Sequence, residues 1–308
     1  MTATTATTSG PGLHAIGPLQ NPRTARGLRF VFKQRYLLWL LVRKEVKVRY
    51  QGSLLGLAWS YIQPIVRFLV YYFIANLIIN HQTPNRALHI FSGMVIMQFF
   101  STCLSAGSKA VIKNKSLVRK INMPREMFPV ASVAVSLYNM FPMYVVLVIA
   151  EFIVGWHPDA MAAVAALLAF AIVVVYGLGT AIILSAANVY VRDTANVVEV
   201  INLVLRWTAP VIYTYSTIQP KLADHPWINQ IYICNPFNAA VMLNNRAFWI
   251  TSFPETDKIS DPIATGVAQE MPPHLFERGL IVFLAGFVFL GLAQLLFSRL
   301  EGRFADKL

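Results

Sequence analysis

Residues 160–187 read AMAAVAALLAFAIVVVYGLGTAIILSAA and contain no charged side chain. A transmembrane α-helix needs about 20 consecutive, mostly apolar residues, and this stretch exceeds that length. The rest of the chain agrees, because 56% of its 308 residues are hydrophobic and only 13% are charged. A soluble domain carries about 25% charged residues. The sequence therefore predicts a membrane protein.

Five further stretches predict membrane-spanning helices, so the expected fold is all-α and polytopic with six spans. The other five spans are residues 57–80, 88–109, 128–154, 196–217 and 279–298. Two of these stretches carry charged residues: the first holds Arg67 beside Pro64, and 196–217 holds Glu199 and Arg206. Charged side chains inside a membrane usually face a bundle interior or a cavity. These residues are therefore functional candidates.

The distribution of Lys and Arg predicts the orientation. Nineteen of the 26, counting Lys109 at the end of the second span, lie before the first span, between the second and third, between the fourth and fifth, or after the last. Cytoplasmic loops carry the excess of basic residues, so we predict a multi-pass protein of the cytoplasmic (inner) membrane with both termini in the cytoplasm. Residues 1–28, rich in Thr, Ala, Gly and Pro, are expected to form a disordered cytoplasmic tail, and 29–308 one transmembrane domain.

Residues 30–52 predict an amphipathic helix ahead of the first span. Its apolar and basic residues fall on different sides, which is typical of a helix lying in the headgroup plane. Two roles remain open. The helix can simply anchor the chain to anionic lipid, or its cations can receive an anionic headgroup such as a diphosphate through charge-assisted hydrogen bonds. The candidate headgroup residues are Arg43, Lys44, Lys47 and Arg49.

The loop KNKSLVRKINMPREMFPV, residues 113–130, carries five Lys or Arg and two prolines. Residues 114–123 predict a short amphipathic helix that Pro124 ends. Cytoplasmic orientation explains the charge but not the helix or the prolines, whereas a docking surface for a cytoplasmic partner explains all three. The predicted docking residues are Lys115, Leu117, Arg119, Lys120, Pro124, Arg125 and Glu126.

The first span is rich in aromatic residues at its centre as well as its ends. Packing against neighbouring helices is one explanation. The other is an aromatic-lined passage, in which flat rings meet the C–H faces of sugars and Tyr hydroxyls donate hydrogen bonds. The candidate channel residues are Trp59, Tyr61, Arg67, Phe68, Tyr71, Tyr72, Arg206, Tyr213 and Tyr215.

The stretch before the last span is apolar in its middle but is interrupted by Asn235 and Pro236. Non-helical backbone at membrane depth survives only where protein or a water-filled cavity covers it. We therefore expect short re-entrant or interfacial helices over about 218–250, at the outer mouth of the bundle. An ordinary amphipathic external loop is the alternative, and 251–278 has no assigned role.

The common catalytic patterns are missing from the sequence. There is no GxxxxGK[ST] phosphate loop, no GxSxG elbow and no close pair of histidines that could hold a metal. We therefore expect no catalytic residue, no metal and no bound cofactor in this chain, and no nucleic-acid partner.

Five stretches together resemble the membrane subunit of ABC-2-type polysaccharide exporters, which transport lipid-linked O-antigen, teichoic acid, capsule and cell-envelope galactan. They are VRYQGSLLGLAWSYIQP, NKSLVRKINMPREMFP, NVYVRDTANVV, PVIYTYSTI and NPFNAAVMLNNR. The resemblance covers about residues 30–308 and excludes the tail.

The resemblance implies a function and an assembly. Two copies would pair around a channel, and two cytoplasmic ATPase subunits would bind ATP and Mg. The helix at 114–123 would be the coupling helix, the segment 218–250 would hold gate helices, and the substrate would be a glycan on a polyprenyl diphosphate. The alternatives are a small-molecule or drug exporter of the same superfamily and a polytopic membrane enzyme of lipid-linked sugar metabolism.

Overall fold

The computed structural model describes residues 27–77, 85–120, 123–222, 224–252, 271–302 and 304–307. Within these ranges the chain is helical and contains no β-strand, which confirms the all-α prediction. Five of the helices are long and apolar enough to cross a membrane. They are α3 (Trp59–Leu77), α4 (Arg86–Lys113), α6 (Met127–Val154), α7 (Ala160–Tyr190) and α13 (Leu275–Glu301).

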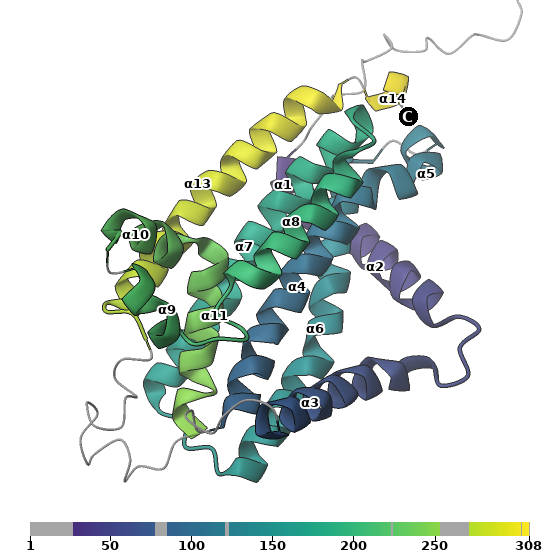
Figure 1. Ribbon diagram of the computed structural model, residues 1–308. Helices are drawn as coiled ribbons and strands as arrows, with labels where there is room; N and C mark the ends of the chain where they lie inside the picture. Colours follow the sequence, from purple (N-terminus) through teal and green to yellow (C-terminus); the bar gives the residue numbers. More distant parts are fainter. Residues whose placement is uncertain are drawn as a thin grey trace, which may run out of the picture.

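Helix α4 is the centre of the bundle and contacts α3, α6, α7, α8 (Thr194–Thr208) and α11 (Pro236–Ala247). In Figure 1, α4, α6 and α7 run side by side, α13 lies along one flank, and α3 crosses the lower part of α4 and α6 at a steep angle. A helix in this central position is covered on most sides, which is why α4 carries buried residues along most of its length.

The contact between α4 and α7 is unusually close. A Cβ atom added at Gly107 of α4 would lie 2.5 Å from the Cβ of Ala181 and 2.8 Å from its Cα. Four residues earlier on α4, Cys103 faces Gly177 of α7. A Cβ atom added at Gly177 would lie 3.2 Å from Cys103 Sγ. Small residues let helices in a membrane approach each other closely, and the resulting van der Waals contact holds them together.

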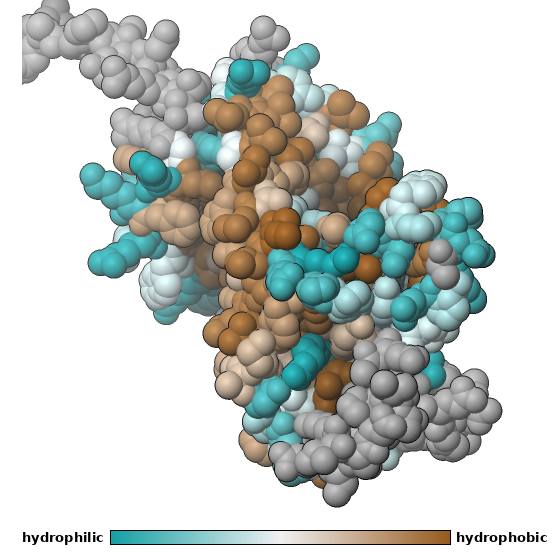
Figure 2. Space-filling model, turned by 90° about the vertical axis from the view of Figure 1, so that its left-hand side faces the viewer, coloured by the Kyte–Doolittle hydropathy of each residue, from teal (hydrophilic) through white to brown (hydrophobic). Residues whose placement is uncertain are grey.

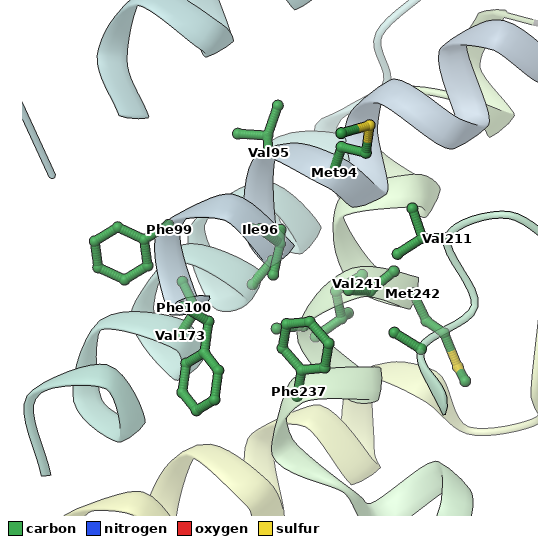
Figure 3. Close-up of a cluster of buried hydrophobic side chains, with 14 of the residues drawn as sticks. Met94, Val95, Ile96, Phe99, Phe100, Val173, Val211, Phe237, Val241 and Met242 are labelled. Carbon is green, nitrogen blue, oxygen red and sulfur yellow. The ribbon is translucent and has the colours of Figure 1, made fainter. Parts of the chain in front are cut away.

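The core beside this contact is built from large apolar side chains of four segments. Figure 3 shows Phe100 of α4 next to Phe237 of α11, with Val173 of α7 and Val211 of the segment after α8 nearby. The rings of Phe100 and Phe237 are stacked with centroids 5.4 Å apart. Helix α11 is therefore a core element rather than part of an exposed loop.

The predicted span 196–217 is wrong in its extent. The helix there, α8, has 15 residues, or about 22 Å at 1.5 Å per residue, which is short of the roughly 30 Å apolar thickness of a bilayer. It ends because Pro210 disfavours the helical conformation of the residue before it, and Ala209 is extended, with φ −79° and ψ 144°. The structure thus has five long apolar helices where the sequence predicted six.

Three short helices follow α8 where the sequence predicted a segment of short helices over 218–250. They are α9 (Tyr215–Leu222), α10 (Pro226–Cys234) and α11. Asn235 begins α11, since its Oδ1 accepts a hydrogen bond from the amide of Phe237 at 3.0 Å and Pro236 occupies the first turn. Helix α11 is enclosed by α4, α7 and α13.

The polar residues of α11 find partners inside the core. Asn244 Nδ2 donates to the carbonyl of Ser92 at 2.8 Å, and Asn244 Oδ1 accepts from the hydroxyl of Tyr144 at 2.9 Å. At its far end, Arg246 pairs with Asp159, the N-cap of α7, at 2.8 Å. Partial burial opposes ionisation of Asp159, but Arg246 and a backbone amide outweigh it and hold the pKa of that carboxyl below its ordinary value.

The N-terminal helix differs from its predicted range of 30–52. Two helices, α1 (Gly27–Lys33) and α2 (Arg35–Tyr50), meet at Gln34. Helix α1 begins inside the predicted tail of 1–28, and residues 1–26 lie outside the described residues. Val31 of α1 and Leu41 of α2 are buried in an apolar cluster with residues from the ends of α6 and α13. The two helices therefore pack partly against the bundle and do not lie only on its surface.

Short elements complete the fold. They are α5 (Lys115–Lys120), α14 (Phe304–Lys307) and the 3₁₀ turns η1 (Gly56–Ala58) and η2 (Ile250–Ser252). Helix α5 occupies most of the predicted range 114–123, of which residues 121 and 122 lie outside the described residues. Helices α5 and α14 lie at the same end of the molecule in Figure 1.

The outer surface suits a lipid environment. Figure 2 shows a band of apolar residues along the face that carries α13, with hydrophilic residues gathered beside it. The large exposed apolar residues of α13 are Leu280, Ile281, Leu284, Phe287, Val288, Leu292, Leu295 and Leu296. An apolar band of this kind matches the hydrocarbon layer that a spanning helix must face.

We expect Gly107→Leu to destabilise the bundle by about 1–3 kcal/mol, because the added side chain would collide with the backbone of Ala181. The matched control is Gly291→Leu in α13, where a Cβ meets nothing within 4 Å and loss of a helical glycine adds about 0.5–1 kcal/mol of stability. Thermal unfolding in detergent measures both. Equal melting temperatures for the two variants would contradict the close packing of α4 on α7.

Candidate functional site

A polar cavity of about 530 Å³ lies between the hinge joining α2 to α3 and the faces of α4 and α6. A second cavity of about 380 Å³ adjoins it and shares Arg49, Thr102, Ser136 and Asn139 with it. The two volumes form one groove along α4 and α6. The first cavity is lined by Arg49, Tyr50, Ser53, Trp59, Ser60, Gln63, Pro64, Arg67, Gln98, Phe99, Thr102, Ser136, Asn139, Met140 and Met143.

The hinge between α2 and α3 brings residues from both helices to this cavity. Gly52 and Gly56 adopt positive φ angles of 77° and 48°, which glycine reaches without the steric cost paid by other residues. The hydroxyls of Tyr50 and Ser60 hydrogen-bond across the turn. The chain therefore reverses direction, and Arg49 and Arg67 line the same cavity although they were predicted for different roles.

The charge of the cavity is positive. Among the residues lining its larger part, Arg49 and Arg67 are cationic and none is acidic. Arg67 Nη1 donates to Gln98 Oε1 at 2.9 Å, which fixes the guanidinium against α4. Glu45, which lines the smaller part, forms an ion pair with Lys113 at 3.2 Å. Two guanidinium groups in one hollow favour an anionic ligand.

The remaining lining combines apolar surfaces with hydroxyl and amide groups. Trp59, Phe99, Met140 and Met143 offer apolar surface. Hydrogen-bonding groups come from Ser60, Gln63, Gln98, Thr102, Ser136 and Asn139. Ligand pockets that orient a specific molecule combine apolar surface with placed polar groups, and this cavity has an unusually large share of the latter. Such a wall can hold a ligand that presents both C–H and O–H groups.

Sequence reasoning missed the polar residues contributed by α4 and α6. Gln98 and Asn139 each lie near the middle of a predicted span, where a polar side chain has no water to bond. That isolation was the available signal. It was weaker than the signal of Arg67, since an amide costs less to bury than a charge does.

The other basic residues predicted to bind a headgroup lie elsewhere on α2. Arg43, Lys44 and Lys47 are exposed and do not line the cavities that contain Arg49. Arg43 lies over the ring of Trp39 at 5.0 Å. Arg49 is also exposed, and it is the one residue of the predicted four that lines these cavities.

The predicted aromatic residues of the first span also divide. Trp59 lines the polar cavity. Phe68 packs edge-on against Phe91 of α4 with ring centroids 5.1 Å apart, Tyr61 and Tyr71 are half-buried, and Tyr72 is exposed. Part of this set therefore packs against the bundle, as the simpler explanation expected.

The remaining predicted channel residues lie around the end of α8. Arg206 is exposed on α8 and lines a small cavity of about 20 Å³ together with Gln98. The hydroxyl of Tyr213 donates to the carbonyl of Thr208 at 2.8 Å, and that of Tyr215 donates to Asn229 at 3.3 Å. These two tyrosines connect α8 to α9 and α10. Of the three residues, Arg206 is the one that lies beside polar residues of α4.

The predicted docking residues do not all face outward. Lys115 is exposed and Leu117 and Pro124 are half-buried, while Arg119 and Lys120 belong to α5 by their backbone. The preceding residue of α4, Lys113, carries the ion pair to Glu45 of α2. One end of α4 therefore connects α5 to the helix that holds Arg49.

Arg125 and Glu126, also predicted for docking, point into the protein instead. Arg125 donates to the backbone carbonyl of Glu301, lies 3.8 Å from its carboxylate, and covers the ring of Phe304. The carboxylate of Glu126 is buried and accepts a hydrogen bond from Gln294 Nε2 at 2.9 Å. Both residues fasten the loop after α5 to α13 and α14. The sequence could not show this, because their partners lie about 170 residues later.

Comparison with known proteins agrees with this architecture. Residues 36–243 match the family model described as ABC-2 type transporter. The chain belongs to this family. The match begins in α2 and ends in α11, so it includes every element that lines the polar cavity.

Named relatives of this ABC-2 type chain are O-antigen export system permease proteins called RfbA. The protein from Myxococcus xanthus is 30% identical over 64% of this chain and 76% of its own length. One from Klebsiella pneumoniae is 25% identical over 91% of this chain and 98% of its own length. A second from the same organism is 26% identical over 75% and 86%. The chain spans most of each relative.

We expect Glu126→Ala to lower the stability of the isolated chain by about 1–3 kcal/mol, since Gln294 loses its buried hydrogen-bond acceptor. Lys115→Ala, a change of an exposed residue in the same loop, should alter stability by less than about 0.5 kcal/mol. Thermal unfolding in detergent, without any partner present, separates the two. A Glu126 variant as stable as the wild type would show that this residue does not fasten the loop.

Proposed function

We propose that this chain is the membrane (permease) subunit of an ABC transporter that exports a polyprenyl-diphosphate-linked polysaccharide across the cytoplasmic membrane. The observation that carries the proposal is the polar cavity, in which Arg49 and Arg67 meet an aromatic residue and several hydroxyl and amide groups. Membership of the ABC-2 type family and the export function named for the relatives support it.

The cavity suits both the diphosphate and the sugars of such a substrate. Guanidinium groups bind phosphate oxygens with paired, charge-assisted hydrogen bonds, so Arg49 and Arg67 would hold the diphosphate. Trp59 would pack on the C–H face of a sugar, and Gln63 and Asn139 would replace water around its hydroxyls. The groove formed with the adjoining cavity gives the glycan a polar path along α4 and α6.

Energy would come from two cytoplasmic ATPase subunits that bind ATP and Mg and contact α5. Ligand or nucleotide shifts a conformational equilibrium only by binding its states differently, so closure of the ATPases must move α5. Helix α5 follows α4 after one residue, and α4 carries Gln98 and Thr102 of the cavity. The Lys113–Glu45 ion pair extends the connection to α2 and hence to Arg49.

We further propose that two copies of the chain pair around one channel, with α8 and the segment after it serving together as the fifth of six spans and α9 to α11 as gate helices. The outward faces of α3 and α8 support pairing, since both carry large exposed apolar residues. Helices α1, α5 and α14 gather at one end of the bundle. The excess of basic residues there supports a cytoplasmic location for that end, with both termini on the same side.

Neutralising the cavity should abolish export without unfolding the protein. For Arg67→Gln and Arg49→Gln we expect binding of the lipid-linked glycan to weaken about tenfold to a hundredfold each, because each removes a charge-assisted hydrogen bond worth about 1.5–3 kcal/mol. The measurement is appearance of glycan on the outer face of cells, together with binding to purified protein. Arg35→Gln, an exposed change on α2, is the control. Normal export by both cavity variants would overturn the proposed site.

Reversing the charge of α5 should uncouple the ATPase. We expect Arg119→Glu with Lys120→Glu to leave the protein folded and inserted but to prevent co-purification with its P-loop ATPase. The control is Arg299→Glu with Lys307→Glu, which makes the same charge change at the same end of the molecule. Unchanged co-purification and unchanged ATP turnover in the α5 variant would contradict the coupling role.

A further inference from the structure

An apolar cavity of about 350 Å³ lies on the side of α4 opposite the polar cavity. Phe99 and Thr102 of α4 face the polar cavity, whereas Phe100 and Leu104 face the apolar one. The remaining walls come from α7, α8, α13 and the start of α11. They include Ile183, Leu184, Ile201, Leu205, Phe237 and Phe289.

The chemistry of this cavity excludes a polar ligand. Its polar side chains are Tyr176, Thr180 and Asn235, and each already bonds within the protein. Tyr176 donates to the carbonyl of Val282 at 3.1 Å, Thr180 donates to that of Tyr176 at 2.8 Å, and Asn235 accepts from Phe237 at 3.0 Å. A polar ligand would lose its hydrogen bonds to water here and would form none in their place. A hydrocarbon chain makes no hydrogen bonds to water, so this cost does not arise.

The apolar cavity is linked to the polar one by a constriction. The small cavity of about 20 Å³ shares Gln98 with the polar cavity, and shares Phe100, Leu205 and Phe237 with the apolar one. Arg206 also lines it. Figure 3 shows Phe100 and Phe237 side by side at this point. The small cavity between α4 and α8 thus adjoins the polar cavity at Gln98 and the apolar cavity at Phe100, and the lining changes around α4 from cationic to hydrocarbon.

The depth of these cavities in the bundle selects the occupant. Gln98 lies about 18 Å along α4 from Arg86 and about 22 Å from Lys113, and Leu104 is only about 9 Å further on. The polar and apolar ends therefore share the middle of the membrane. A resident phospholipid keeps its headgroup at the membrane surface, because a charge at the bilayer centre is costly. A lipid with its headgroup at Gln98 and its tail beyond α8 is one in transit.

We propose that the cavity between α7, α8 and α13 holds the isoprenoid chain of the exported lipid while its diphosphate lies in the polar cavity at Arg67 and Gln98. This inference rests on the proposed function, which supplies the isoprenoid carrier. It adds that head and tail lie on opposite sides of α4 and that the chain passes beneath α8. In the present conformation the constriction is closed, so α8 must move away from α4 for the chain to enter.

Photo-labelling with two matched probes tests the assignment. The full chain is reconstituted in nanodiscs of phosphatidylethanolamine and phosphatidylglycerol. One probe is geranylgeranyl diphosphate with a diazirine on its terminal isoprene unit, and the other is phosphatidylglycerol with a diazirine near the end of one acyl chain. We expect the isoprenoid probe to label Ile183, Leu184 or Leu205, and the phospholipid probe to label the exposed Leu284 and Val288 of α13.

Filling the cavity provides the matched variants. Leu184→Trp and Ile201→Trp fill it from α7 and α8 respectively, and both should lose isoprenoid labelling at the cavity. Leu284→Trp, on the exposed face of α13, should keep it. Size-exclusion elution and thermal unfolding of each variant confirm the fold, and two filling variants on different helices guard against misfolding of one.

The possible failures are distinguishable. Equal labelling of the cavity by the phospholipid probe would assign it to bulk lipid and would overturn the inference. Isoprenoid labelling confined to α3 near Arg67 would overturn the inference and leave the proposed function standing. Absence of specific isoprenoid labelling anywhere on the protein would contradict both.

Discussion

The close approach of α4 to α7 at Gly107 and Ala181 is the constraint on which the rest of the structure depends. Because helices in lipid gain little from the hydrophobic effect, they associate through van der Waals contact and polar bonds. A backbone-to-backbone contact at this point makes α4 the central helix, with α6, α3, α8 and α11 arranged around it. Each cavity that we assign to function is then formed on a face of α4 that a neighbouring helix does not fill completely.

Much of this architecture could be predicted from the sequence, since five of the six predicted spans are long, mostly apolar runs whose ends agree with the helices within a few residues. The prediction of the fifth span failed at Pro210. Hydropathy measures how apolar a stretch is and does not test whether its backbone is helical. The apolar residues after Pro210 belong to an irregular segment leading to α9. The burial of α11 was also beyond hydropathy, because its buried asparagines find their partners in other segments, as Asn244 does in Ser92 and Tyr144.

The candidate site was only partly predictable for a related reason. Arg49 and Arg67 were each identifiable as unusual residues, but the positive φ angles at Gly52 and Gly56 that bring them to one cavity are a property of the folded hinge. Gln98, which orients Arg67, needed knowledge of which face of α4 meets α3. Sequence patterns indicate which polar side chains are unusual in a membrane-spanning segment. Which of them line the same cavity depends on the fold.

The contacts around α5 show how a movement at this end of the bundle would be distributed. Helix α5 follows directly on α4, which is tied to α2 by Lys113 and Glu45, and the loop after α5 is held to α13 and α14 by Arg125 and Glu126. The contact with α13 is buried, whereas the ion pair to α2 is exposed at Lys113 and therefore weak, about 0–1 kcal/mol. A displacement of α5 would thus carry α13 with it as one body, while α2 could part from α4. The polar cavity lies between α2, α3 and α4, and the apolar cavity lies beside α13. The difference in strength between the two contacts would therefore let the polar cavity change shape, while the wall formed by α13 moved with the bundle.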